Sequence, residues 1–334
     1  MQILIVNQDE VRRLLPMAEC LDVMARTLAA LARGEALLPL RQVLMLPGGQ
    51  GAFGAMPAHL SSPPAVGIKV ITVFPGNHGT AYDSHQGAVL LFETERGRLL
   101  AVMDASSITA IRTAAVSGVA TRALARADAS TLALLGSGVQ AATHLEAVAL
   151  VRPLRRVRVW SRDPAHVARF VDAARKRHGF AIEAAPSARE AVADADVVCT
   201  VTASREPVLE GAWLRAGTHV NAVGASLRTA RELDSAAVAR ARVFVDRRES
   251  AANEAGDLLM ARAEGAIGDD HVQGELGEVL LGRVDGRRTP DEITVFKSLG
   301  LAVEDVASAH HIHARAQAAG MGTWVELGGG RDAG

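Results

Sequence analysis

Hydrophobic and polar positions divide the chain into two parts with different rhythms. In the first part, apolar runs such as GIKVITV and LLAVMD are separated by glycine turns, which predicts several strands. The segment 106–126 predicts a long helix, with Ser106 or Ser107 as its N-cap. Between residues 131 and 245, apolar runs of three to six residues alternate with helical segments. This alternation is typical of an α/β fold with a doubly wound parallel sheet.

The alternating part opens with a glycine turn at residues 131–145, TLALLGSGVQAATHL. An apolar strand precedes the turn, and a helix opens at Val139. The spacing G-x-G-x-x-A is typical of a dinucleotide-binding turn, in which Gly136 permits a sharp exit from the strand and Gly138 lets a pyrophosphate approach the backbone. Ala141 allows the helix to pack closely on the strand. The helix start then offers N–H groups and a positive dipole end to the phosphates.

The second strand of this unit distinguishes a nucleotide site from a purely structural turn, which can have the same spacing. VRVW at 157–160 follows at the distance expected of a βαβ unit, so the nucleotide interpretation is favoured. An acid after this strand is typical of NAD-selective proteins, whereas an arginine suits the 2′-phosphate of NADP. Here Ser161 and Arg162 come first and Asp163 follows. We therefore expect NADPH as the cofactor, with NADH as the alternative.

Composition narrows the class of protein without identifying its chemistry. A length of 334 residues favours two domains, and a net charge of −1 gives no indication of nucleic-acid binding. The chain has only two cysteines and no apolar run of membrane-spanning length, and no basic leader precedes an apolar core at its start. We therefore expect a soluble, cytoplasmic protein that binds neither nucleic acid nor membrane.

Two further features concern single side chains. Only three of the 36 basic residues are lysines, and one of them, Lys69, lies inside the apolar segment VGIKVITV. A compact ammonium retained there suggests a function that arginine cannot supply. His310 and His313 share a face of the last predicted helix, but no third ligand of the right kind lies near them in the sequence, so we expect no metal site.

Eight ordered motifs between residues 41 and 305 resemble the ornithine cyclodeaminase/mu-crystallin family. They are GIKVITVFPGN, SHQGAVLLFE, MDASSITAIRTAAVSG, GSGVQA, HVNAVGAS, EAGDLL, GELGEVL and DEITVFKSLG. The resemblance implies a discontinuous arrangement, with a Rossmann domain at 119–295 inserted in a second, α+β domain. That second domain, 1–118 plus 296–334, would bind substrate and form a homodimer.

The resemblance also implies roles for individual residues. Arg41, Lys69 and Arg112 match the cationic group that holds a substrate carboxylate, and Leu299 matches a substrate-binding position. Lys69, Arg112 and Ser226 are the candidate catalytic residues. The candidate cofactor-binding residues are Ser84, Arg112, Thr113, Gly136, Gly138, Val139, Gln140, Ser161, Arg162, Thr202, Val223, Ser226 and Ser298.

One departure from the cyclodeaminase pattern bears on the activity. Cyclodeaminases of this family have an acid where this chain has Ser226, and a serine hydroxyl cannot replace a base tuned near neutral pH. Glu232 and Asp234 are the nearest acids that could substitute. The serine version resembles the ketimine-reductase branch, which implies NAD(P)H-dependent reduction of a small cyclic imino acid. An alanine dehydrogenase, a cyclodeaminase and a non-enzymatic binding protein remain the alternatives.

Overall fold

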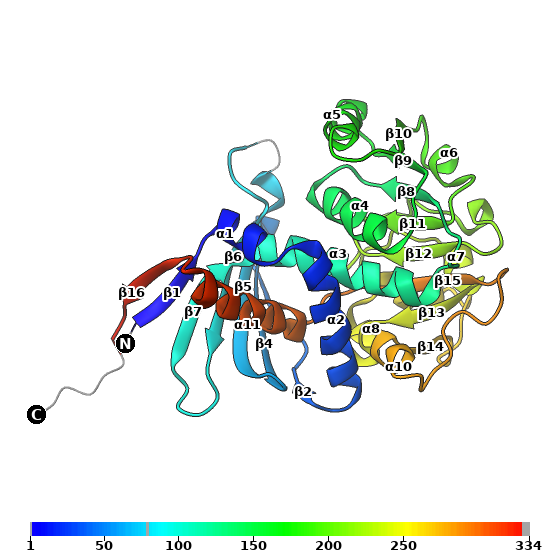
Figure 1. Cartoon of the computed structure of the whole chain (residues 1–334). Helices are drawn as coiled ribbons and strands as arrows, with labels where there is room; N and C mark the ends of the chain where they lie inside the picture. Colours follow the sequence, from blue (N-terminus) through cyan, green and yellow to red (C-terminus); the bar gives the residue numbers. More distant parts are fainter. Residues whose placement is uncertain (1, 78–79, 329–334) are drawn as a thin grey trace, which may run out of the picture. The chain divides into compact units, whose positions relative to one another are not determined.

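A computed structural model describes residues 2–77 and 80–328 and divides the chain into two compact units (Figure 1). The first unit comprises Met1–Arg112 and Leu301–Gly334, and the second comprises Thr113–Gly300. The second unit is therefore an insertion in the first. The family resemblance places residues 113–118 and 296–300 in the first unit, whereas they lie in the second. None of the described helices is long and apolar enough to span a membrane.

The second unit is built on an eight-stranded sheet in the order β10-β9-β8-β11-β12-β15-β13-β14. All its pairings are parallel, so the predicted doubly wound sheet is confirmed. The strands are β8 (Thr131–Leu135), β9 (Arg156–Trp160), β10 (Ala181–Ala184), β11 (Val197–Thr200), β12 (His219–Ala222), β13 (Ala241–Val245), β14 (Val272–Glu275) and β15 (Ile293–Lys297). The connecting helices are α4 (Val139–Val151), α5 (Pro164–Arg175), α6 (Ala188–Val192), η3 (Gly211–Trp213), α7 (Ser235–Ala239), α8 (Arg248–Glu254), α9 (Gly256–Ala263) and α10 (Leu276–Leu280).

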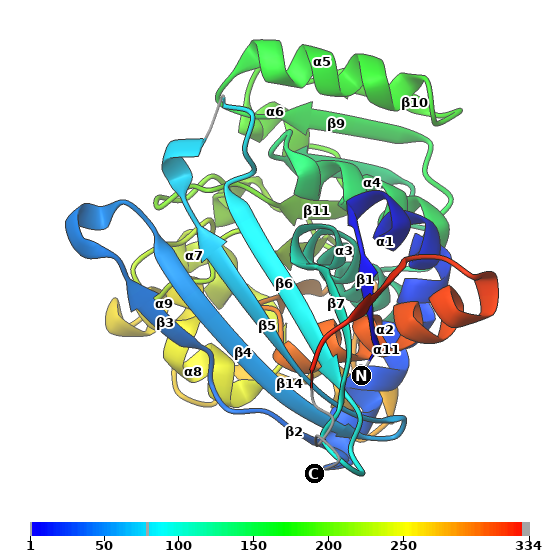
Figure 2. The same ribbon diagram turned by 90° about the vertical axis from the view of Figure 1, so that its left-hand side faces the viewer.

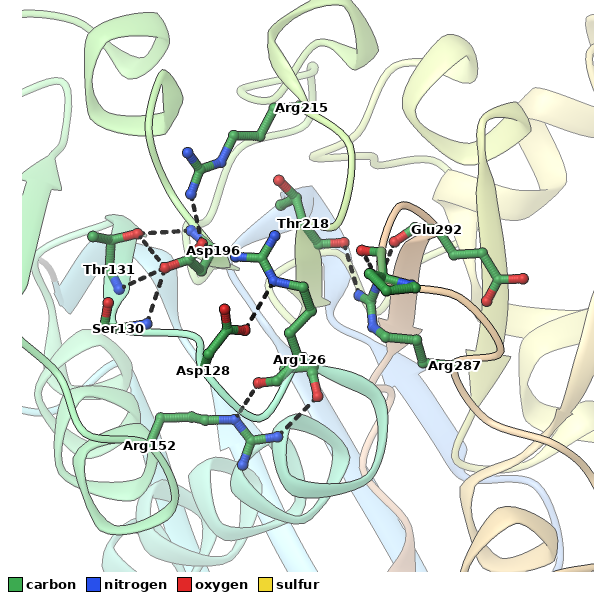
Figure 3. Close-up of polar contacts among 12 residues, drawn as sticks. Arg126, Asp128, Ser130, Thr131, Arg152, Asp196, Arg215, Thr218, Arg287 and Glu292 are labelled. Carbon is green, nitrogen blue, oxygen red and sulfur yellow. Dashed lines mark hydrogen bonds and ion pairs between the residues drawn. The ribbon is translucent and has the colours of Figure 1, made fainter.

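A buried carboxylate, that of Asp196, connects the amino-terminal ends of two central strands of this sheet (Figure 3). Asp196 accepts hydrogen bonds from the backbone N–H groups of Ser130 and Thr131, at 2.9 and 3.0 Å. The same carboxylate pairs with Arg126 and Arg215, at 2.5 Å each. These contacts join the starts of β8 and β11. They lie at the opposite end of the strands from the glycine turn, so their role is structural.

The first unit contains a second eight-stranded sheet, in the order β16-β1-β7-β6-β5-β4-β2, with β3 paired to β4. Its strands are β1 (Gln2–Val6), β2 (Ala36–Leu37), β3 (Gln42–Met45), β4 (Ala52–Ser61), β5 (Pro64–Val73), β6 (His85–Phe92), β7 (Leu99–Asp104) and β16 (Thr323–Glu326). Figure 2 shows the long antiparallel strands β4, β5 and β6 side by side. The helices and short turns are α1 (Gln8–Leu14), α2 (Met17–Ala32), η1 (Pro47–Gly49), η2 (Pro75–Asn77) and α11 (Ala302–Ala319).

The two faces of this sheet have different neighbours. Helix α11 packs on β4, β5 and β6. A Cβ added at Gly67 would lie 2.9 Å from Val306, so the glycine allows the helix to approach the strand. Residues that alternate with Gly67 point to the opposite face, where Val66 and Phe53 remain 38% and 39% exposed. This apolar face is not covered by α11.

The helix α3 (Ala105–Leu124) begins differently from the prediction. Ser106 and Ser107 were expected as N-caps, but both lie inside the helix, and that expectation is wrong. The carboxylate of Asp104 accepts a hydrogen bond from the Ser107 N–H at 2.7 Å, so Asp104 performs the capping. The side chain of Ser106 instead donates to the carbonyl of His85. The sequence offers three residues of capping type within four positions, Asp104, Ser106 and Ser107, and only the end of β7 decides among them.

Candidate active site

The glycine turn of the second unit has the backbone geometry that a pyrophosphate site needs. Gly136 has a φ of 125°, and a Cβ there would lie 2.7 Å from the carbonyl oxygen of Val201. Gly138 is the N-cap of α4, and a Cβ there would meet nothing within 4 Å. Gly138 has no side chain to cap this helix, so the N-cap residue leaves the first N–H groups of α4 without a side-chain acceptor. Ala141 is fully buried against the sheet.

The position of this turn in the sheet also suits a dinucleotide. β8 lies between β9 and β11, so the chain leaves β8 on one side and later returns on the other. Ligands of doubly wound sheets bind at the carboxyl ends of the strands beside such a switch point. The residues Gly136, Gly138, Val139 and Gln140 lie together there. This turn therefore fits a dinucleotide pyrophosphate at the start of α4.

The end of β9 carries the residues expected to distinguish NADP from NAD. Asp163 is the N-cap of α5, and its carboxylate accepts from the backbone of Ala165 and His166 at 2.8 and 3.3 Å. The carboxylate of Asp163 thus caps the amino-terminal end of α5. The Ser161 hydroxyl lies 2.9 Å from the hydroxyl of Ser137 in the glycine turn, and the Arg162 side chain is exposed.

Two loops that follow β11 and β12 carry further candidate cofactor residues. Thr202 lies in the first loop, and Val223 and Ser226 lie in the second. Both the N–H and the hydroxyl of Thr202 donate to Glu232 Oε1, at 2.6 Å each. Glu232 Oε2 accepts from the N–H of Gly224 at 2.7 Å. Glu232 is fully buried, and burial raises the pKa of its carboxyl.

The remaining candidates of the second unit lie on α3, after β12 and at the end of β15. Ser298, at the end of β15, donates its backbone N–H to Ala222 at 3.0 Å. Leu299 donates its N–H to the buried carboxylate of Asp246 at 2.6 Å, so the backbone after β15 is held in place. Thr113 is 7% exposed and lies on α3. Ser226 is half-buried.

In the first unit, the structure brings Lys69 and Arg112 together at a shared acid, Asp305. Lys69 Nζ lies 2.8 Å from Asp305 Oδ2, and Arg112 Nε donates to Asp305 Oδ1 at 3.0 Å. Arg112 also donates to Glu304 at 2.8 Å. All four side chains are at most 4% exposed. Thr109 accepts from Lys69 Nζ at 3.4 Å, which places the ammonium against α3.

The environment of this group changes the protonation of the lysine. Burial lowers the pKa of Lys69 from its ordinary value of 10.5 to about 8. The positive charges of Arg112 and Arg41 act in the same direction, and the carboxylate of Asp305 opposes them. A pKa of about 8 keeps Lys69 mostly protonated at neutral pH and lets it release a proton readily. Lys69 therefore has the properties of a proton donor near neutral pH.

The acids Glu304 and Asp305 were not identified from the sequence, although they decide the charge of the group. Two cations, Lys69 and Arg112, are balanced by two carboxylates within hydrogen-bonding distance. Arg41 is close enough for its positive charge to lower the pKa of Lys69 as well. The available signal was an acidic pair at the start of an otherwise apolar helical segment, AVEDVASA.

One predicted residue of the first unit, Ser84, lies beside a histidine that is close to this group. The pKa of His85 is lowered by burial and by the charge of Lys69, so this histidine is near the ammonium. The hydroxyl of Ser84 lies 3.1 Å from His85 Nδ1. Ser226 and Leu299 belong to the second unit, whereas Arg41, Lys69 and Arg112 belong to the first. Among the described residues, no group of three potential ligands is arranged to hold a metal ion.

The fold and these motifs match one protein family over most of the chain. The model of the ornithine cyclodeaminase/mu-crystallin family matches residues 1–320. The chain belongs to the ornithine cyclodeaminase/mu-crystallin family. Within it, the chain is 40% identical to mouse ketimine reductase mu-crystallin over 280 residues, which cover 84% of this chain and 85% of that protein.

Solved structures of similar enzymes superpose closely on this fold. Δ1-pyrroline-2-carboxylate reductase of Thermococcus litoralis, in complex with NADH and L-proline, gives a TM-score of 0.94 at 37% identity and covers 96% of this chain and 99% of that one. An archaeal alanine dehydrogenase dimer with bound NAD gives 0.92 at 34% identity, covering 98% and 100%. These similarities support an inserted Rossmann-type unit in an α/β protein.

Proposed function

We propose that this protein reduces a cyclic imino acid with NAD(P)H. Δ1-pyrroline-2-carboxylate and Δ1-piperideine-2-carboxylate are the candidate substrates, giving L-proline and L-pipecolate. The observation that carries the proposal is the buried ammonium of Lys69, which has a pKa of about 8 and is held by Asp305. The relative solved with NADH and L-proline supports the same reaction class.

The residues of the first unit suit the two needs of this reduction. When bound, the reduced nicotinamide supplies a hydride for the carbon of the C=N bond, and the nitrogen gains a proton. The ammonium of Lys69 donates that proton to the nitrogen and becomes a neutral amine. Arg41 and Arg112, whose positive charges both act on Lys69, hold the substrate carboxylate. Binding both reactants in one orientation contributes much of the rate gain.

NADPH is the cofactor that we propose. Ser161 and Arg162 follow β9, where the ribose of the adenosine half binds in Rossmann folds. The carboxylate of Asp163 accepts from two backbone N–H groups of α5, so it serves the helix rather than the ribose. An exposed guanidinium beside two hydroxyl groups, Ser137 and Ser161, suits a 2′-phosphate.

A reductase is favoured over a cyclodeaminase by the state of the nearby acids. Ser226 lacks the carboxylate of the lyases, and Glu232 and Asp234 were the candidates to replace it. Glu232 accepts three hydrogen bonds inside the second unit. Asp234 caps α7, accepting from Ala237 at 2.7 Å and from Gly211 at 2.8 Å. Either acid would have to break these hydrogen bonds before it could act as a proton-transferring base.

We propose that the protein is a homodimer formed through the first unit. The sheet face opposite α11 carries Val66 and Phe53, each more than a third exposed. The edge strand β3 adds Leu44 and Met45, which are 63% and 62% exposed. An apolar face of this kind is typical of a protein interface. The similar archaeal enzyme was solved as a dimer, which supports the proposal.

A single panel of steady-state assays tests the proposed function. Net NADPH or NADH oxidation with either cyclic imine supports it. Faster turnover with pyruvate plus ammonia would instead indicate an alanine dehydrogenase. Ammonia release from ornithine without net change in cofactor would indicate a lyase. Cofactor binding with turnover of none of these substrates would contradict the reductase and leave a binding role.

A further inference from the structure

Glu232 makes an unusual set of contacts for a residue outside both groups of predicted site residues. Its carboxylate accepts from three donors, which belong to two separate loops: the N–H and hydroxyl of Thr202 and the N–H of Gly224. It is fully buried. Because all three partners donate, both carboxylate oxygens act as acceptors here. Glu232 thus connects the loops that follow β11 and β12 through hydrogen bonds.

Two further buried charged residues, Asp257 and Lys297, lie behind Glu232. Asp257 Oδ1 accepts from the backbone N–H groups of Glu232 and Leu233, at 2.8 and 2.9 Å. Asp257 Oδ2 lies 2.8 Å from the ammonium of Lys297, and both side chains are at most 2% exposed. Apolar side chains would fill such a core at least as stably, since buried ions lose much hydration free energy. The hydrogen bonds of Asp257 fix the position of the backbone at Glu232 and Leu233.

The two loops approach each other so closely that only glycine is accommodated. A Cβ at Gly224 would lie 2.1 Å from the carbonyl oxygen of Thr202 and 2.5 Å from Glu232 Oε1. The backbone on either side of the contact leads directly to candidate cofactor residues, Thr202 itself and Ser226. The spacing of the loops thus depends on the small residue and on the carboxylate together.

The position of these loops indicates which half of a dinucleotide they serve. In a doubly wound sheet, the adenosine ribose lies at the end of the strand after the glycine turn, which is β9 here. The strands β11 and β12 lie on the other side of β8. A dinucleotide whose pyrophosphate lies at the start of α4 therefore extends its second nucleotide toward the loops that Glu232 joins.

We propose that Glu232 is a positioning residue for the nicotinamide half of the cofactor site. It holds the Thr202 and Gly224 loops at the spacing that this half requires, and Asp257 and Lys297 keep its backbone and surroundings in place. The inference rests on the proposed dinucleotide-dependent function. It goes further by stating that Glu232 affects binding of the nicotinamide half of the cofactor and not of the adenosine half.

The test compares two ligands by isothermal titration calorimetry. One is whichever of NADPH and NADH the wild type binds more tightly. The other is the matching fragment without nicotinamide, 2′-phospho-ADP-ribose or ADP-ribose. Glu232→Gln replaces one acceptor oxygen by an NH₂ that must face a donor, so the dissociation constant of the whole cofactor should rise about tenfold to a hundredfold. The dissociation constant of the fragment should change less than about twofold.

Two further variants complete the experiment. Glu210→Gln makes the same chemical change at an exposed site and should leave both dissociation constants unchanged. Gly224→Ala keeps the buried charges but pushes the loops apart, so it should reproduce the selective loss even where Glu232→Gln does not fold. An equal loss for both ligands, or no loss for either, would overturn the inference. If the wild type binds neither ligand, the proposed function itself fails.

Discussion

Asp305 offers the sharpest test of how the first unit controls its buried lysine. Asp305→Asn keeps the shape of the side chain but removes the negative charge between Lys69 and Arg112. The Lys69 ammonium, 2.8 Å from the carboxylate in the native protein, then faces a neutral amide and a neighbouring guanidinium. We expect the pKa of Lys69 to fall further below its already lowered value of about 8.

The size of the effect follows from the distances. At an effective dielectric constant of ~20, two opposite charges 4 Å apart attract by about 4 kcal/mol, and Asp305 lies nearer than that to Lys69. One pH unit corresponds to about 1.4 kcal/mol. Even if relaxation recovers half of the lost attraction, the pKa should fall by at least about one unit. Removing one partner of a buried pair should also lower the free energy of unfolding by about 3–5 kcal/mol.

The assay is the pH dependence of kcat/KM for the cyclic imine between pH 5.5 and 9.5. Lys69 must be protonated to act, so the wild-type value should fall as the pH rises through about 8. In Asp305→Asn the fall should begin at least about one unit lower, with activity partly regained in mild acid. Asp172→Asn, the same change on an exposed helix surface, should keep the wild-type profile. A falling limb unmoved in Asp305→Asn would refute this account of Lys69.

Three further outcomes are expected. Arg162→Ala should reduce the ratio of kcat/KM for NADPH to that for NADH by about tenfold or more, and an unchanged ratio would mean that another group reads the 2′-phosphate. Incubation with ornithine and NAD should give no proline, because Ser226 cannot act as the base, so proline formation at a useful rate would contradict the reductase assignment. Light scattering at micromolar concentration should give the mass of a dimer, and Phe53→Asp should shift it toward the monomer; a monomeric wild type would remove the interface.

The features that could be predicted from the sequence are those that depend on neighbouring residues. The glycine turn at Gly136 and Gly138 is an example, since its spacing reflects the backbone needs of one strand exit and one helix start. The alternation of apolar runs with helical segments likewise predicted the parallel sheet, because each element shows its own periodicity. Lys69 could be identified from the sequence because a charged residue in an apolar strand is conspicuous even when its partners are unknown.

What the sequence did not decide is which distant groups meet. Asp305 and Arg112 are separated by 193 positions, and Glu232 meets Thr202 and Asp257 from different elements. A buried charge is stable only with its partners, and those partners are chosen by the register of the strands and the placement of the helices. Residue type alone therefore identified Lys69 as a candidate, but only the tertiary structure determined its charge balance and its pKa, because both depend on side chains that the fold brings to it.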